Sequence, residues 1–251
     1  REKEKKEARK NSKEKANRNL EKAAKAAEAE TPAAPPPQPL DLSDMRKFLT
    51  TPVPRECGVV QCCIKRDKSG TNMMFPKYTL YLDKGDRFLM TSRKRPHNRL
   101  SNYLISMSEH DLSREGPCYL GKLRKTNMYG TEFVVYDDGC NPKDASEGGD
   151  NNKPRTELAA CTYAPNVIGS RGPRKMQVAV PQLDENYSSS MSKTPIGENL
   201  DLLNLLKEKD FKNVSYMINK PPRWNSNVSA YVLNFQGRVT MASVKNFQLV
   251  D

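Results

Sequence analysis

The chain has 251 residues, enough for one large all-β domain or two smaller ones. Its 42 Lys and Arg against 30 Asp and Glu give a formal net charge of +12, which favours polyanionic partners such as nucleic acid or an anionic membrane leaflet. No apolar stretch approaches the roughly 18 residues that a membrane-spanning helix needs. We therefore expect a soluble intracellular protein. Because the sequence does not begin with Met, we also expect it to be part of a longer chain.

The residue types used in catalysis and metal binding form no recognisable motif. The six cysteines are scattered, without a Cys-x-x-Cys, so we expect reduced thiols and no metal site. His97 and His110 lie in polar segments without a nucleophile elbow, and there is no Walker loop or dinucleotide-binding glycine motif. Asp137 and Asp138 fit a turn better than a hydrolytic pair. We predict that the chain is not an enzyme and needs no cofactor.

The first 40 residues are predicted to form a charged arm and a linker. Residues 1–30 mix Lys, Arg, Glu and Ala, with Leu20 as the one larger aliphatic residue, which is typical of a solvated helix or a disordered basic arm. Residues 31–40 contain five prolines, which indicate an extended spacer. For the arm, a solubilising linker and a segment that docks on a partner or a membrane both remain open.

Residues 41–251 are predicted to form one mainly β domain. A short helix is expected within residues 40–49, with Ser43 as its N-cap. From Val59 onward, about nine to eleven short runs rich in β-branched and aromatic residues are separated by turn residues, a spacing typical of a barrel or a sandwich. Residues 197–211 differ, because their leucine spacing predicts a short amphipathic helix in an insertion.

Cationic residues near the middle of the chain are candidates for an anion site. Lys122 and Arg124 are two positions apart, so a strand would place their side chains on one face. Arginine binds phosphate oxygens bidentately, lysine adds a compact charge, and asparagine adds a neutral donor. From the residue pattern alone, an anion pocket and a salt-bridged strand surface are equally good interpretations. The candidates are Arg93, Lys94, Arg95, Asn102, Lys122 and Arg124.

Several motifs of the chain resemble those of the tubby-like proteins and occur in that family's order. The string FQGRVTMASVKNFQ at residues 235–248 is very similar to the family signature. The matching motifs together span roughly residues 56–250, and the further ones are SNYLIS (101–106), YLGKLR (119–124), EFVVYDDGCNP (132–142), RTELAAC (155–161), NVIGSRGPRKM (166–176) and KPPRWN (220–225).

The resemblance implies a closed antiparallel β-barrel around a central apolar helix, with a basic pocket on its wall that binds phosphatidylinositol 4,5-bisphosphate. This chain ends at Asp251, before the positions of that helix, so we expect the domain to be incomplete at its C-terminus. Cations near the pocket would add general membrane attraction, for which we select Arg93, Lys94 and Arg95. The positions that match the family's headgroup-binding residues are Asn102, Lys122, Arg124 and Arg155.

For the family, this pocket serves membrane tethering and the delivery of receptors into cilia, and the segment before the barrel docks the intraflagellar transport A complex. We therefore expect a monomeric phosphoinositide-binding adaptor, cytoplasmic and peripheral at the plasma membrane, and present in the cilium. The alternative is a DNA-binding transcription regulator that moves to the nucleus after release from the membrane, with steeply salt-dependent binding. A purely structural scaffold would bind neither ligand.

Overall fold

The structure of this chain is a computed structural model. The chain divides into two compact units, Arg1–Pro39 and Leu40–Asp251. The expectations for the arm, for most of the proline-rich linker and for His97 lie outside the described residues. The described residues are 37–82, 87–96, 98–142, 153–165, 174–183, 201–226, 230–235, 237, 239 and 245–251.

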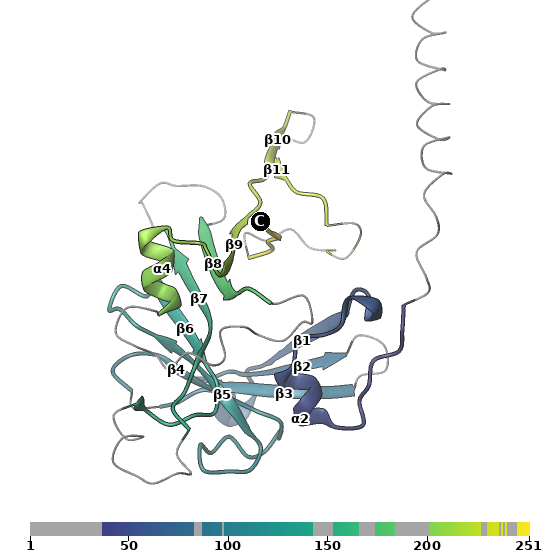
Figure 1. Ribbon diagram of the computed structural model, residues 1–251, viewed down its shortest axis with the longest axis vertical. Helices are drawn as coiled ribbons and strands as arrows, with labels where there is room; N and C mark the ends of the chain where they lie inside the picture. Colours follow the sequence, from purple (N-terminus) through teal and green to yellow (C-terminus); the bar gives the residue numbers. More distant parts are fainter. Residues whose placement is uncertain are drawn as a thin grey trace, which may run out of the picture. The chain divides into compact units, whose positions relative to one another are not determined.

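A ten-stranded antiparallel sheet dominates the second unit, which confirms the mainly β prediction (Figure 1). Strands that are consecutive in the sequence pair from β1 to β9, and β12 then pairs with β9. A separate two-stranded sheet pairs β10 (Arg223–Asn225) with β11 (Ala230–Val232). The ten strands are β1 (Cys62–Asp67), β2 (Lys77–Leu82), β3 (Arg87–Lys94), β4 (Asn102–Ser106), β5 (Tyr119–Lys125), β6 (Glu132–Tyr136), β7 (Glu157–Tyr163), β8 (Met176–Pro181), β9 (Val214–Asn219) and β12 (Leu249–Val250).

The main core forms where helix α4 (Leu202–Glu208) packs on β7 and β8 (Figure 1). The strand register aligns Val134 with Ala160, and Ala160 with Ala179, so small side chains make room for the helix. This helix confirms the amphipathic helix predicted within residues 197–211. Its buried leucines are Leu202, Leu203, Leu205 and Leu206.

Helix α2 (Met45–Thr50) begins at a different residue from the one predicted. Asp44 is its N-cap, because the Lys47 backbone N–H donates to Asp44 Oδ1 at 3.0 Å. Ser43 instead donates its hydroxyl to Asp41 Oδ1 at 2.6 Å. The prediction of Ser43 as the cap is therefore wrong: an Asp one position later satisfies the free N–H of the first turn equally well.

The two outer strands of the large sheet, β1 and β12, are not paired with each other in the part of the chain that the structure describes. Closure of the sheet into a barrel stays a prediction. Two 3₁₀ turns, η1 (Arg55–Cys57) and η2 (Gly70–Asn72), flank β1 in the sequence. No helix among the described residues is long and apolar enough to cross a membrane.

Candidate anion-binding site

Strands β4 and β5 bring three of the four predicted headgroup residues onto one face of the sheet. Asn102, the first residue of β4, lies directly opposite Arg124 on β5. Opposed residues of an antiparallel pair, and residues two positions apart on one strand, point to the same side. Asn102, Lys122 and Arg124 therefore share one face, and their role as lipid ligands stays a prediction.

The ring of Tyr136 on β6 connects the fourth residue, Arg155, to this group. Tyr136 lies opposite Lys122 in the β5–β6 ladder, and Lys122 Nζ is 5.8 Å from the ring centroid. Arg155 precedes β7, and its Cζ is 4.5 Å from the same centroid. An aromatic face attracts cations through its quadrupole. Tyr136 therefore gathers two cations without neutralising their charge.

A close backbone approach fixes the position of Arg155. Its N–H donates to the Cys140 carbonyl oxygen at 2.8 Å, beside a bridge between Cys140 and Pro154. A side chain at Gly139 would place its Cβ 2.4 Å from Arg155 Cα. Only glycine allows this contact, so the YDDG turn supports the site through its backbone.

The site contains charged and polar groups that no other group in the described part of the chain pairs with. Lys122 is only 6% exposed, although burying an unpaired charge is costly. Among the described residues, no carboxylate lies within ion-pair distance of Lys122, Arg124 or Arg155. The buried Asn102 Oδ1 and Arg155 Nε also have no hydrogen-bond partner there, which is unusual in folded proteins. A ligand with anionic oxygens and a hydroxyl donor would satisfy all of these groups.

The electrostatics of Lys122 show that positive charge is concentrated at this site. Burial, followed by the charge of nearby cations, lowers the pKa of Lys122 from 10.5 to about 8. One of these cations, Arg114, was not among the residues selected from the sequence, whereas Arg95 was selected as an auxiliary contact. The contributing cations are Arg155, Arg114, Arg124 and Arg95.

The carboxylate of Glu157 supports the packing of α4. Its Oε2 accepts from the Leu202 N–H at 2.8 Å, and its negative charge helps to raise the pKa of the Tyr136 hydroxyl. Burial raises the pKa of Glu157, and burial also raises the pKa of Tyr136 to about 12. Sequence reasoning missed both residues. The hairpin pairing could have revealed Tyr136, because a turn at residues 127–131 places it opposite Lys122.

The three auxiliary cations do not share one face. Arg93 lies opposite Leu104, which is two residues after Asn102 on β4, so Arg93 points to the face of the site. Lys94 is the next residue and points to the other face. Arg95 follows β3, is exposed, and contributes to the lowered pKa of Lys122. Their role at a membrane stays a prediction.

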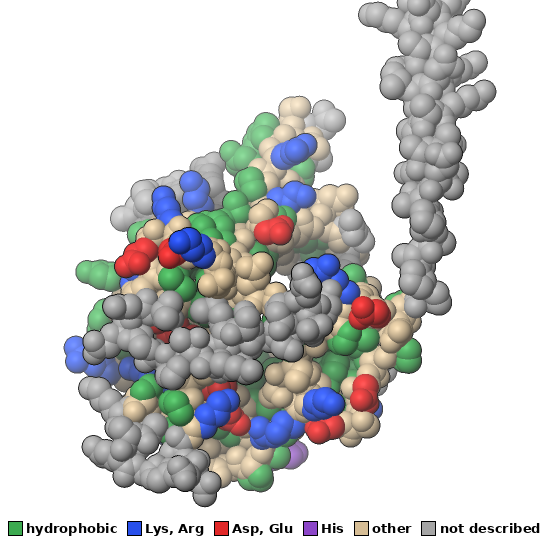
Figure 2. Space-filling model, viewed as in Figure 1, with side chains coloured by type: hydrophobic (Ala, Val, Ile, Leu, Met, Phe, Trp, Pro, Cys, Tyr) green, Lys and Arg blue, Asp and Glu red, His purple; other side chains and the backbone are tan. Residues whose placement is uncertain are grey.

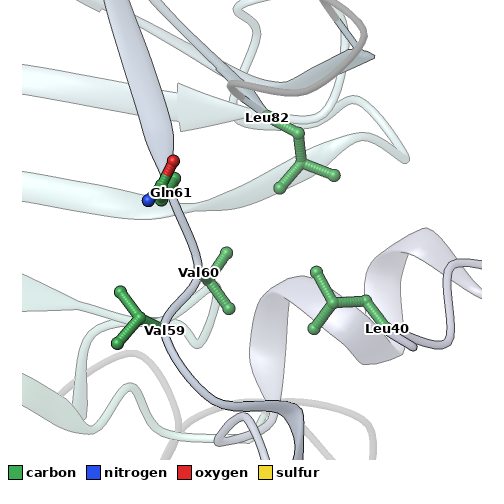
Figure 3. Close-up of a pocket in the computed structure, with 5 residues that line it drawn as sticks. All are labelled: Leu40, Val59, Val60, Gln61 and Leu82. Atoms are coloured by element: carbon green, nitrogen blue, oxygen red, sulfur yellow. The ribbon is translucent and has the colours of Figure 1, made fainter. Parts of the chain in front are cut away.

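Other features of the described residues are less suited to binding an anion. A pocket near the start of β1 is mainly apolar, with one polar side chain in its lining (Figure 3). On the face drawn in Figure 2, Lys and Arg side chains are interleaved with Asp and Glu, which weakens the local potential. Within the described part of the chain, no group of His, Cys, Asp and Glu could hold a metal. The pocket residues are Leu40, Val59, Val60, Gln61 and Leu82.

The fold and the site thus define an antiparallel β protein with a basic candidate site for anions on its sheet. The sequence profile of the Tub family matches residues 49–251. The chain belongs to the Tub family, as its motifs predicted. Membership of this family agrees with the prediction that the chain is not an enzyme.

Known relatives resemble most of this chain but are longer. Tubby-related protein 3 of Mus musculus is 43% identical over 215 residues, which cover 84% of this chain and 46% of that protein. Tubby-related protein 3 of Homo sapiens is 44% identical, with coverages of 84% and 48%. Tubby protein homolog 1 of Caenorhabditis elegans is 40% identical over 219 residues, with coverages of 83% and 50%. The chain spans about half the length of these relatives.

Proposed function

We propose that this chain is a phosphoinositide-binding adaptor and that Asn102, Lys122, Arg124 and Arg155 bind the headgroup of phosphatidylinositol 4,5-bisphosphate. The observation that carries the proposal is a buried Lys122 among arginines, with no carboxylate at ion-pair distance within the described residues. Two neighbouring ring phosphates supply several anionic oxygens for these cations. A hydroxyl group on the ring would donate a hydrogen bond to Asn102 Oδ1.

The expected strength of this site suits a reversible interaction. Charge-assisted hydrogen bonds contribute about 1.5–3 kcal/mol each. Three cations would therefore supply roughly 5–9 kcal/mol before the costs of association, which corresponds at best to about micromolar affinity. Arg93 and Arg95 would each add about 1 kcal/mol of general attraction to an anionic membrane. Loss of the phosphoinositide would then release the protein.

The wider role in this proposal comes from the family to which the chain belongs. In this proposal residues 41–251 belong to a closed barrel around an apolar helix, after the arm (1–30) and the linker (31–40). The protein acts as a monomer at the plasma membrane and in the cilium, where it delivers membrane receptors with the intraflagellar transport A complex. A DNA-binding regulator in the nucleus is the competing function, and it would need many cations along an extended surface.

Sedimentation with vesicles tests the proposed ligand. The double variant Lys122→Ala/Arg124→Ala is expected to lose at least about tenfold in affinity for vesicles that contain phosphatidylinositol 4,5-bisphosphate, because two charge-assisted contacts disappear. Lys212→Ala/Lys220→Ala removes the same charge from two exposed positions that flank β9 and should bind within about twofold of the original chain. Equal losses in both variants, or full binding by the first with an unchanged circular dichroism spectrum, would overturn the proposal.

A further inference from the structure

The turn between β5 and β6 presents two large apolar side chains directly after the cations of the candidate site. Met128 is 62% exposed and Tyr129 is 91% exposed. They follow Arg124 by four and five positions on the same hairpin. Because the two side chains are adjacent in the sequence and exposed beside the site, they offer one apolar surface for contact.

Hydrogen bonds within the turn order the backbone that carries these side chains. Asn127 Nδ2 donates to Thr131 Oγ1 at 2.6 Å, and the Thr131 N–H donates back to Asn127 Oδ1 at 3.1 Å. Gly130 adopts a φ of 68°, which glycine tolerates best. Because the turn is already ordered, little conformational entropy is lost when its tip moves from water into an apolar environment.

The order of the strands places further residues of the same kinds at this end of the sheet. In an antiparallel meander, alternate connections lie at the same end, so the β1–β2, β3–β4 and β5–β6 connections share one end. The β1–β2 connection exposes Met73 (73%) and Met74 (79%), and it is joined to β3 because Arg93 Nη1 donates to Asn72 Oδ1 at 3.4 Å. Arg95 begins the β3–β4 connection. Basic residues therefore lie between two exposed apolar tips.

This combination of groups fits the surface of an anionic bilayer. Lipid phosphates attract the cations, while methionine reaches the acyl boundary and the amphipathic tyrosine suits the interface. We propose that Met128 and Tyr129 insert into the interfacial region of the bilayer whose headgroup occupies the site. The inference rests on the proposed function and adds an apolar contact to it.

Two ligands separate this inference from the proposed function. In Met128→Ser/Tyr129→Ser, affinity for phosphatidylinositol 4,5-bisphosphate vesicles should fall about tenfold or more, because two apolar side chains no longer leave water. Affinity for soluble inositol 1,4,5-trisphosphate, measured by calorimetry, should stay within about twofold of the original chain, since this ligand has no bilayer. Val59→Ser is the matched control, because Val59 is 89% exposed and precedes β1, at the opposite end of the sheet.

Each outcome decides one of the two proposals. Unchanged vesicle affinity in the double variant would overturn the insertion and leave the headgroup site standing, and the tip would then face a protein partner. If the original chain binds neither vesicles nor inositol trisphosphate, both proposals fail. A direct check uses Tyr129→Trp in a Trp224→Phe background: quenching of the new tryptophan by brominated lipids supports insertion, and an unquenched signal on bound vesicles excludes it.

Discussion

Lys122 is the buried cation of the candidate site, and its surroundings change its protonation. Its ammonium group is almost fully buried, lies 5.8 Å from the centroid of the Tyr136 ring, and has a pKa lowered to about 8 by burial and then by neighbouring arginines. A bound anion reverses this shift, because negative charge favours the protonated form. The free site therefore gives up its proton near pH 8, whereas the occupied site keeps it.

The pH dependence of headgroup binding follows from this difference. Affinity for inositol 1,4,5-trisphosphate is expected to fall between about pH 7.5 and 9.5, by at most about tenfold per pH unit, because the proton that Lys122 has lost must be taken up again on binding. Ionisation of the ligand cannot cause this fall, because its phosphates gain negative charge as the pH rises and would then bind the cations more tightly. Calorimetry in buffers of matched ionic strength measures the profile.

Lys122→Arg is the control for this titration. An arginine stays protonated throughout the range, so the variant should bind with nearly constant affinity even where its geometry weakens the contact. A flat profile in the original chain, or an equal fall in the variant, would contradict the assignment of the titrating group to Lys122.

At the scale of single elements, β5 depends on a glycine that lets β6 approach. Gly121 has a φ of 152°, and a Cβ at this position would lie 2.2 Å from the Tyr136 carbonyl oxygen. Gly121→Ala is expected to destabilise the domain by about 1–3 kcal/mol, through backbone strain and displacement of β6. Urea denaturation measures this loss.

Gly130→Ala provides the comparison within the same hairpin. Gly130 also has a positive φ, of 68°, but its added Cβ would meet only Lys125 Cδ, at 3.6 Å. The expected loss is about 1 kcal/mol, from the left-handed conformation alone. If Gly121→Ala lowers the free energy of unfolding no more than Gly130→Ala does, the close approach of β5 and β6 does not require a glycine.

The stability of the sheet face also depends on helix α4. Leu202 is 2% exposed, so Leu202→Ala should leave a cavity and cost about 2–5 kcal/mol. Leu158 on β7 is 47% exposed, and Leu158→Ala should cost less than about 1 kcal/mol. Denaturant unfolding of both variants tests the contrast. Similar losses would mean that α4 contributes little to the core.

Local sequence signals predicted those parts of the fold that depend on neighbouring residues. Alternation predicted that Lys122 and Arg124 share a strand face, and leucine spacing predicted α4. Ser43 and Asp44 are both good caps, so composition could not decide between them. The place of Arg155 over Tyr136 depends on the backbone contact at Gly139, which is 16 positions away in the sequence. Such contacts leave no periodic signal in the sequence.

At the scale of the whole molecule, the net charge of +12 allows two kinds of polyanion. A compact headgroup uses the few cations around Lys122, whereas DNA requires many cations along a surface and loses affinity steeply with salt. We expect vesicles with phosphatidylinositol 4,5-bisphosphate to bind more tightly than phosphatidylserine vesicles of equal total charge. Both vesicle types should bind more tightly than a DNA duplex at physiological ionic strength. Co-sedimentation and electrophoretic mobility shift measure these affinities, and tighter binding to DNA would favour the nuclear role.

The most direct test of the headgroup site is an NMR titration of the labelled chain with inositol 1,4,5-trisphosphate. We predict saturable shifts that are largest for Asn102, Lys122, Arg124 and Arg155, with a smaller response at Tyr136 beneath them. Shifts that are largest elsewhere in the chain, or that grow without saturation across many surface lysines, would contradict a defined headgroup site on β4 and β5.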